Sequence, residues 1–454
     1  MPGRSTVGMR TVKAHWRWVN SPPASATPGA AAGQSTARHG TDRHFYRAQN
    51  GFKPTGYRAA DTEHMRLAEI IALRGTVCAG LLVTMTERCP LSCGHCSSAS
   101  TLDGRDLDAA QLLAFLATFT AQDRPEVVML TGGEPMMRPE LVAEAAATAR
   151  VSGARTAVLT GAFFARTGRI PGRIRDTIST LDHFSVSLDA FHEREVPRAE
   201  VFALLRLVLD LGVATSLHIV GSNSEDPYLA EVTSAVRATF GTEVPMLVSE
   251  VRGIGRGSAL ATGPPATDVA SAAPCSMAAW PVLTPDGVFT ACCNQDVVDG
   301  RDRPEHLVLG RLGERWQRVR GRATGCGLLR MVRTVGPVHI ANRIPLGVPG
   351  ERDACTACTG LDRHTGSGSW ADEVGSGPAG ELLERAALAK YAQAGAEGFV
   401  RRYGSPRYAR LVGDQDRADP VDHQAQIVDG VEVVVLAQRQ VGGAEAEQIG
   451  GSGR

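Results

Sequence analysis

The sequence lacks an excess of charge of either sign, because 48 acidic residues balance 48 Lys and Arg over 454 residues. That balance argues against a nucleic-acid-binding surface or an acidic tail. The sequence also lacks an apolar run of the roughly 18 residues that mark a membrane-spanning helix. Its basic N-terminus is not followed by the apolar core of a secretory signal. We therefore expect a protein that binds neither nucleic acid nor membrane.

Cysteine, in contrast, is plentiful and clustered. A large chain without a secretory signal more often uses close cysteines as metal ligands than as disulfides. The expected compartment is the reducing cytoplasm. The ten cysteines stand at positions 78, 89, 93, 96, 275, 292, 293, 326, 355 and 358.

Short apolar runs alternate with segments of helical period between residues 79 and 260, which is typical of a parallel sheet with helices outside. Six such β/α units are fewer than a closed eight-fold barrel needs. We therefore predict an α/β fold, a partial (β/α)6 barrel. The predicted strands are 81–84, 126–130, 156–159, 184–188, 215–220 and 245–248, and the predicted helices are 107–119, 139–151, 170–181, 200–211 and 229–240.

The remaining segments differ in composition from this region. Residues 1–64 are rich in Pro, Ala and Ser and are expected to be disordered. Residues 261–274 are a predicted linker, and the part that follows, as far as residue 360, is expected to be irregular. The expected organisation is a barrel over 75–260, a cysteine-rich domain over 275–365, and a helix (380–402) with a flexible tail, including a strand candidate at 431–436, over 375–454.

The first cysteine cluster follows the first predicted strand, at Cys89, Cys93 and Cys96. Thiolates are the natural ligands of iron–sulfur clusters, and three ligands leave one iron of a four-iron cluster open. A zinc site is the alternative. It normally has four ligands, and His95 could be the fourth.

Two further motifs lie at strand ends, where ligands bind in open α/β sheets. Gly132, Gly133 and Glu134 follow the second strand, where glycines permit close approach of a ligand and a carboxylate can pair with an ammonium group. Ser187 and Asp189 follow the fourth strand, although Asp189 could simply cap a helix.

The cysteine spacing, together with Gly-Gly-Glu-Pro at 132–135, resembles the radical S-adenosylmethionine (radical SAM) superfamily. The resemblance covers about residues 79–260 and implies that Cys89, Cys93 and Cys96 hold a 4Fe–4S cluster whose open iron chelates S-adenosylmethionine. It also implies that Glu134, with Gly132 and Gly133, contacts the methionine amino group. His95 takes the position of an aromatic residue near the adenine, and Ser187 and Asp189 become candidates for ribose contacts. The segment 251–257 resembles a Gly-Arg segment found in members with a C-terminal cluster domain.

The second cysteine cluster begins at Cys275. Asp286-Gly287 predicts a hairpin that brings Cys292 beside Cys275, and Cys355 and Cys358 add a pair. By count alone, four thiolates suit zinc or an iron–sulfur cluster equally well.

This region resembles the SPASM or twitch extension of radical SAM enzymes. The resemblance implies one auxiliary 4Fe–4S cluster on Cys275, Cys292, Cys355 and Cys358. Cys293 and Cys326 are left over. Each could replace a ligand, act on substrate or be an inert buried thiol, and Cys78 is expected in the core.

The implied function is reductive cleavage of S-adenosylmethionine to a 5′-deoxyadenosyl radical, which abstracts a hydrogen atom from the substrate. A flavodoxin or ferredoxin is the expected electron donor. We predict a peptide substrate, with a small molecule of natural-product biosynthesis as the alternative. A non-catalytic zinc scaffold is the competing class, but it leaves Gly132, Gly133 and Glu134 without a role.

Overall fold

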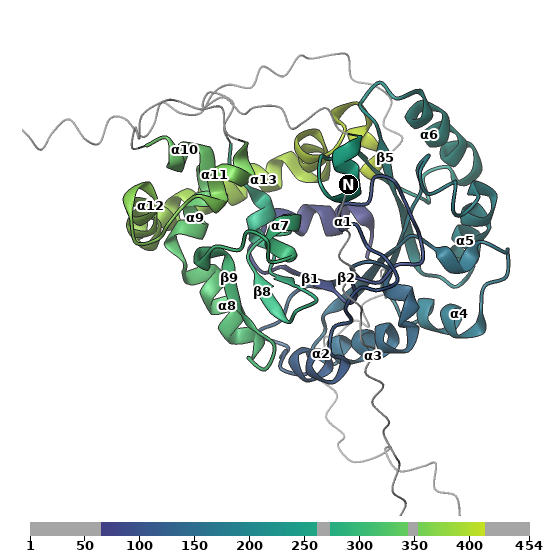
Figure 1. The fold of residues 1–454 in the computed structure, drawn as a ribbon, viewed down its shortest axis with the longest axis horizontal. Helices are drawn as coiled ribbons and strands as arrows, with labels where there is room; N and C mark the ends of the chain where they lie inside the picture. Colours follow the sequence, from purple (N-terminus) through teal and green to yellow (C-terminus); the bar gives the residue numbers. More distant parts are fainter. Residues whose placement is uncertain (1–64, 261–272, 344–352, 414–454) are drawn as a thin grey trace, which may run out of the picture. The chain divides into compact units, whose positions relative to one another are not determined.

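The computed structural model describes residues 65–260, 273–343 and 353–413 (Figure 1). The predictions for 1–64 and 431–436, and for most of the linker 261–274, concern residues outside these ranges. No helix in the described ranges is long and apolar enough to cross a membrane.

One sheet of nine strands organises the described part of the chain, in the order β6-β5-β4-β3-β2-β1-β7-β8-β9. The first six strands are all parallel to their neighbours and lie in sequence order, as expected for successive β/α units. All six match predicted strands. They are β1 (Gly80–Thr84), β2 (Val127–Thr131), β3 (Arg155–Thr160), β4 (His183–Ser187), β5 (Ala214–Gly221) and β6 (Met246–Glu250).

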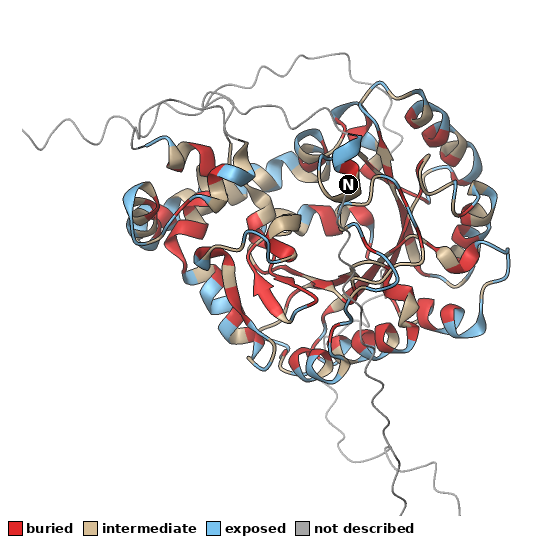
Figure 2. Ribbon diagram, viewed as in Figure 1, coloured by how far each residue is buried: buried red, intermediate tan, exposed pale blue. Residues whose placement is uncertain are grey.

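Five helices connect these strands and lie along the outer side of the sheet in Figure 1. The strand side chains that face them are apolar and buried, such as Val83, Leu130 and Val186, and Figure 2 shows buried residues along the strands and on the helices around them. The predicted partial, open barrel is confirmed. The helices are α2 (Ala109–Leu116), α3 (Pro139–Arg150), α4 (Gly172–Ile178), α5 (Arg198–Asp210) and α6 (Pro227–Phe240).

The inner face of the sheet is covered at one end by α1 (Leu67–Ala72) and Trp280. Trp280 is buried and donates from Nε1 to the Leu73 carbonyl at 2.9 Å. Its ring lies so close to Gly80 that a Cβ there would come within 2.3 Å of it. This packing closes the end of the barrel opposite the carboxyl ends of the strands, which leaves those ends free to form a site.

The predicted hairpin is confirmed as β7 (Val282–Leu283) and β8 (Val288–Thr290), joined through Asp286 and Gly287, and Gly287 has a φ of +77°. β7 pairs in parallel with β1, so the cysteine-rich region continues the same sheet. β9 (Val308–Arg311) completes it. The opposite edge, at β6, is covered by η8 (Pro406–Val412), where Ser405 N donates to the Val248 carbonyl at 2.9 Å.

The expectation of an irregular segment up to residue 360 is wrong, because five short helices lie there. The long C-terminal helix is confirmed as α13 (Pro378–Tyr403), although Gly395 interrupts its helical conformation. A further helix, α12, precedes it where none was predicted. The additional helices are α7 (Gln295–Val298), α8 (Trp316–Gly325), α9 (Gly327–Thr334), α10 (Pro337–Ala341), α11 (Ala354–Thr359) and α12 (Gly366–Ser376).

Candidate active site

A cavity of about 310 Å³ opens at the carboxyl ends of the parallel strands. Cys89, Cys93 and Cys96 all line it, and all three are free thiols. The loop that carries them is held by backbone bonds, including Cys89 N to the Thr101 carbonyl at 2.8 Å. Burial raises the pKa of the Cys89 thiol to about 12, so a metal that binds there must displace its proton.

Gly132 and Gly133 follow β2 and pack against the start of the cysteine loop, where Gly133 N donates to the Thr86 carbonyl at 2.6 Å. Gly132 has a φ of +136°, and a Cβ on it would meet the Thr86 carbonyl oxygen at 2.4 Å. A Cβ on Gly133 would meet the Arg88 carbonyl oxygen at 2.3 Å. The two glycines are therefore required for the β2 end to pack against the start of the cysteine loop, and both line the cavity.

Glu134 presents a fully buried carboxylate at the cavity wall. Its Oε1 accepts from the Thr160 hydroxyl at 2.7 Å and from Met136 N at 2.9 Å, while Oε2 accepts from Gly161 N at 2.9 Å. Burial raises the Glu134 pKa to about 7, against the lowering effect of these hydrogen bonds. Among the residues that the structure describes, Oε2 accepts from one donor, so it keeps acceptor capacity for a positively charged ligand group.

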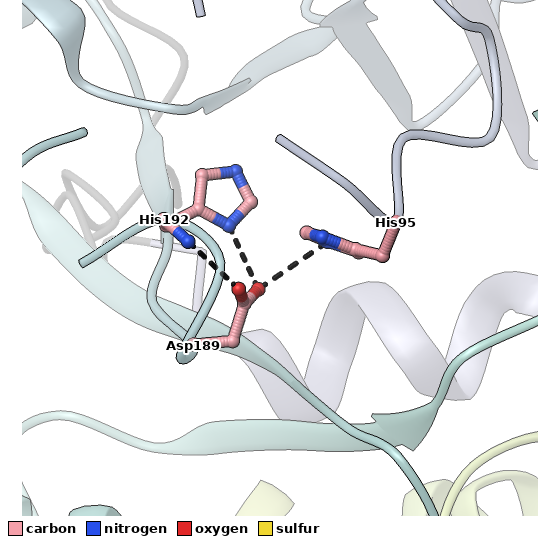
Figure 3. A group of neighbouring side chains, drawn as sticks. All are labelled: His95, Asp189 and His192. Atoms are coloured by element: carbon pink, nitrogen blue, oxygen red, sulfur yellow. Dashed lines mark hydrogen bonds and ion pairs between the residues drawn. The ribbon is translucent and has the colours of Figure 1, made fainter. Parts of the chain in front are cut away.

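The two candidates after β4 have different positions. Ser187 lines the cavity, but Asp189 does not and is fully buried behind it. Asp189 Oδ1 accepts from the backbone N of Phe191 and of His192, both at 2.9 Å. Asp189 Oδ2 lies 2.7 Å from His192 Nδ1 and 3.4 Å from His95 Nε2 (Figure 3). The geometry therefore gives Asp189 the role of orienting a turn and two imidazoles.

The paired imidazoles form part of the cavity wall. Burial opposes protonation of His192, but the Asp189 hydrogen bond and a hydrogen bond with Cys93 raise its pKa to about 10. His95 also lines the cavity, and burial lowers its pKa. Its ring packs 4.7 Å from that of Phe191, and its buried Nδ1 has no hydrogen-bond partner in the described residues. A buried nitrogen without a partner among these residues is available to a water or to a polar ligand atom.

Arg256 was not singled out individually in the sequence, although it lies in the 251–257 segment. Its Nε donates to the Cys93 carbonyl at 2.9 Å and its Nη1 to the Ser100 carbonyl at 2.8 Å. Gly255, with a φ of +56°, lies so close to the cysteine loop that a Cβ on it would meet the Ser97 carbonyl oxygen at 2.2 Å. The segment after β6 is thus hydrogen-bonded directly to the cysteine loop. The sequence feature that could identify Arg256 is the Gly-Arg pattern of this segment. For His192, the sequence offers only its spacing of three residues from Asp189.

The four cysteines predicted as a second ligand set lie close enough to influence one another. The charges of Cys355 and Cys358 act on Cys275 or Cys292, and burial raises the pKa of all four thiols. Cys355 and Cys358 are three residues apart on α11, a spacing that places both side chains on one face.

The remaining cysteines are divided between this group and the core. Cys293 interacts with Cys292 and Cys355 and so belongs to the same group. Cys326 is elsewhere, 3.8 Å from Asp372 Oδ1. Cys78 is buried in the core, as expected.

The residues of the first cavity fit the implied cofactors. Three free thiols suit an iron–sulfur cluster, the buried carboxylate of Glu134 suits an ammonium group, and the unpartnered His95 Nδ1 suits a polar ligand atom. The cavity volume lies at the lower end of the roughly 300–1,000 Å³ typical of small-molecule sites.

Comparison with known proteins gives matches in the same region. Residues 83–231 match the family model described as the radical SAM superfamily. The PqqA peptide cyclase of Methylobacterium nodulans is 30% identical over 172 residues, which cover 35% of this chain and 44% of that protein. The PqqA peptide cyclase of Gluconobacter oxydans is 31% identical over 150 residues, covering 31% and 40%. The matches thus span less than half the length of these curated relatives.

Similar solved structures have low sequence identity. Streptococcus suis SuiB bound to precursor peptide SuiA is 12% identical with a TM-score of 0.38, covering 49% of this chain and 61% of that chain. Native anSMEcpe with bound AdoMet is 10% identical with a TM-score of 0.39, covering 69% of this chain and 99% of that chain.

Proposed function

Because residues 83–231 form a domain of the radical SAM superfamily, we propose that this chain is a radical SAM enzyme acting on a peptide. Cys89, Cys93 and Cys96 would hold a 4Fe–4S cluster, and the cavity beside them would bind S-adenosylmethionine. The observation that carries the proposal is that the three free cysteines and the buried Glu134 line one cavity. A zinc scaffold needs no such carboxylate.

The bound cluster and S-adenosylmethionine together supply a one-electron cleavage of a carbon–sulfur bond and a carbon radical that removes hydrogen from substrate. The chain's own residues bind and orient. Glu134 would hold the amino group of the ligand, while Gly132 and Gly133 allow its close approach. Ser187 is positioned for a hydroxyl contact, and His95 offers a free Nδ1 to the same cavity.

A second group of residues keeps the reacting region fixed and dry. Arg256 holds the backbone of the cysteine loop, and Asp189 fixes the rings of His95 and His192. Leu91, Leu159 and Val220 give the cavity an apolar part that excludes water from the reacting atoms.

The substrate class and setting rest on other observations. The matched curated relatives are named peptide cyclases, which favours a peptide substrate for this chain. We also propose an auxiliary 4Fe–4S cluster on Cys275, Cys292, Cys355 and Cys358, an external one-electron donor, and a cytoplasmic location, since all ten cysteines are free. The domain limits 75–260 and 275–365 belong to the same proposal.

The experiment that tests this function uses anaerobically reconstituted protein. We would count iron per chain in the unchanged protein and in a Cys89/Cys93/Cys96→Ala variant, and measure 5′-deoxyadenosine after adding dithionite and S-adenosylmethionine. About eight irons should fall to about four, with deoxyadenosine lost. Cys326→Ala is the matched control and should keep both. Zinc in place of iron, or no deoxyadenosine from fully loaded protein, would contradict the proposal.

A further inference from the structure

An arginine without a carboxylate partner lies beside the second group of cysteines, which stand at positions 275, 292, 293, 355 and 358. Arg74 is half-buried, and its guanidinium lies over the Trp280 ring, 4.4 Å from the ring centre. Its Nη2 donates to Met277 Sδ at 3.1 Å and lies 4.0 Å from Cys293 Sγ. In the described ranges Arg74 forms no ion pair with a carboxylate, so its charge faces an aromatic ring and two sulfur atoms.

These neighbours are a poor environment for a lone cation. Thioether and thiol sulfurs are weak hydrogen-bond acceptors, and a partly buried charge is unfavourable without a counter-charge. Cys293 belongs to the second cysteine group, because its charge acts on both Cys292 and Cys355. Cysteines bind metals as negatively charged thiolates. An occupied cysteine group would therefore supply the counter-charge that Arg74 lacks.

Two further arginines lie near the same cysteines. The positive charge of Arg402 acts on Cys275, and that of Arg252 acts on Cys355. Both side chains donate to backbone carbonyls, and neither forms an ion pair in the part of the chain that the structure describes. The carboxylate of Asp353 also acts on Cys355, with the opposite sign. The side-chain charges identified beside this group are thus three positive and one negative.

We propose that Arg74, together with Arg252 and Arg402, supplies the positive charge that balances the auxiliary cluster and raises its reduction potential. The proposal rests on the proposed function, because it requires a cluster at the second cysteine group. Reduction makes a cluster more negative by one charge, and a nearby positive charge favours that state. Arg74 contributes most, because it is half-buried beside Cys293, whereas water and salt screen the two exposed arginines. The charge acts through space, so the effect does not require Cys293 to be a ligand.

The test measures the midpoint potential of the auxiliary cluster alone. The background protein is the full chain with Cys89, Cys93 and Cys96 replaced by Ala, so that the first cluster cannot form. Anaerobically reconstituted protein is titrated with dithionite in the presence of redox mediators. The potential is read from absorbance and from the electron paramagnetic resonance signal of the reduced cluster, and iron is counted in every variant.

Three substitutions are compared in this background. Arg74→Gln removes the charge, and Arg74→Lys keeps it. Arg206→Gln is the matched control, because Arg206 also lies over an aromatic ring, 5.5 Å from the centre of Phe240, but on α5.

We expect Arg74→Gln to shift the one-electron equilibrium roughly tenfold toward the oxidised cluster, which lowers the midpoint potential by about 59 mV. Arg74→Lys should restore most of the potential, because the ammonium group keeps the positive charge although it cannot stack as a guanidinium does. The Arg206→Gln control should have the potential of the background protein. Iron should stay at about four per chain throughout.

Three results would overturn the inference and leave the proposed function intact. They are an unchanged potential in Arg74→Gln, an equal drop in the control, or an equal drop in Arg74→Lys, which would assign the effect to lost packing rather than lost charge. If Arg74→Gln fails to hold iron, Arg252→Gln/Arg402→Gln decides, since it should lower the potential by a smaller amount and no shift would overturn the inference. Zinc in place of iron in the background protein would instead refute the auxiliary cluster itself, and the inference with it.

Discussion

Arg256 Nε lies 2.9 Å from the backbone carbonyl oxygen of Cys93, across 163 residues of sequence. A second bond, from Nη1 to the Ser100 carbonyl, is 2.8 Å long, and the backbone N of Arg256 donates to the Cys96 carbonyl at 2.9 Å. Arg256 alone therefore fixes both ends of segment 93–100, which carries two of the proposed cluster ligands, Cys93 and Cys96. The loop cannot shift without breaking charge-assisted hydrogen bonds.

Replacing Arg256 by Gln should loosen this loop and shorten the lifetime of the cluster. Each of the two lost side-chain hydrogen bonds involves a charged group and contributes at most about 1.5–3 kcal/mol to the stability of the loop. We expect iron to be lost to a chelator about tenfold faster than from the unchanged protein. Arg237→Gln, on α6, is the control because, in the ranges that the structure describes, its side chain bonds only to the Gly241 carbonyl next to its own helix. Equal iron retention in Arg256→Gln would contradict the clamp.

Glu134→Gln should weaken binding of S-adenosylmethionine and remove its pH dependence. Loss of the carboxylate charge should weaken the binding free energy by about 1.5–3 kcal/mol, which raises the Kd roughly 10–100-fold. Since burial raises the Glu134 pKa to about 7, the carboxylate takes up a proton as the pH falls through 7 and can no longer pair with an ammonium group. Affinity of the unchanged protein should therefore fall between pH 7.5 and 5.5, by at most about tenfold per pH unit below the pKa.

The measurement is equilibrium binding of S-adenosylmethionine to reconstituted protein across that pH range. Glu250→Gln is the control, since Glu250 is another acidic residue that lines the same cavity. A pH profile that persists unchanged in Glu134→Gln would show that some other group titrates.

The six β/α units could be predicted because their apolar periodicity is strong and local. The helices of the cysteine-rich region could not. α12 carries glycines at 366, 368 and 375, which ordinarily argue against a helix. The structure shows what they provide. A Cβ on Gly375 would lie 2.1 Å from the Gly327 carbonyl oxygen, so Gly375 lets α12 pack directly on α9, and a Cβ on Gly368 would lie 2.0 Å from the Asp362 carbonyl oxygen. That requirement is tertiary and leaves no local signal.

The residues of the candidate site also fall into those that the sequence could identify and those that it could not. The cysteine triplet and Gly132–Glu134 are contiguous motifs, and both were visible in the sequence. The contacts of Arg256 and His192 were not, because their partners are backbone carbonyls or a buried carboxylate brought near only by folding. Asp189 was recognised as a candidate, but its distance from the cavity depends on the turn after β4.

Asp189→Asn should destabilise the fold by about 3 kcal/mol near neutral pH, because it leaves His192 buried without its carboxylate partner. In the unchanged protein the His192 pKa is raised to about 10 from its ordinary 6.5. The stabilisation from a proton held more tightly in the folded state is complete below pH 6.5 and is lost as the pH rises through 10. The difference between the two proteins should therefore shrink from pH 6 to pH 10.

Chemical denaturation of metal-free protein at pH 6, 8 and 10 measures this difference. Asp226→Asn is the control, because Asp226 also accepts backbone N–H bonds, at the start of α6, but contacts no histidine within the described part of the chain. It should cost about 1 kcal/mol, independent of pH in this range. A pH-independent loss in Asp189→Asn would assign Asp189 a purely capping role.

Single Cys→Ser variants should distinguish the ligands of the auxiliary cluster from their neighbours. Cys358→Ser should lower iron from about eight to about four per chain, while deoxyadenosine formation driven by dithionite continues, because the first cavity is untouched. Cys326→Ser should keep all the iron, since its thiol contacts Asp372 rather than the other cysteines.

Cys293→Ser separates the two ligand sets that the structure allows. Cys293 Sγ is 4.0 Å from the Arg74 guanidinium and acts on both Cys292 and Cys355. Full iron in this variant would favour Cys275, Cys292, Cys355 and Cys358 as the ligands, and loss of about four irons would place Cys293 among them.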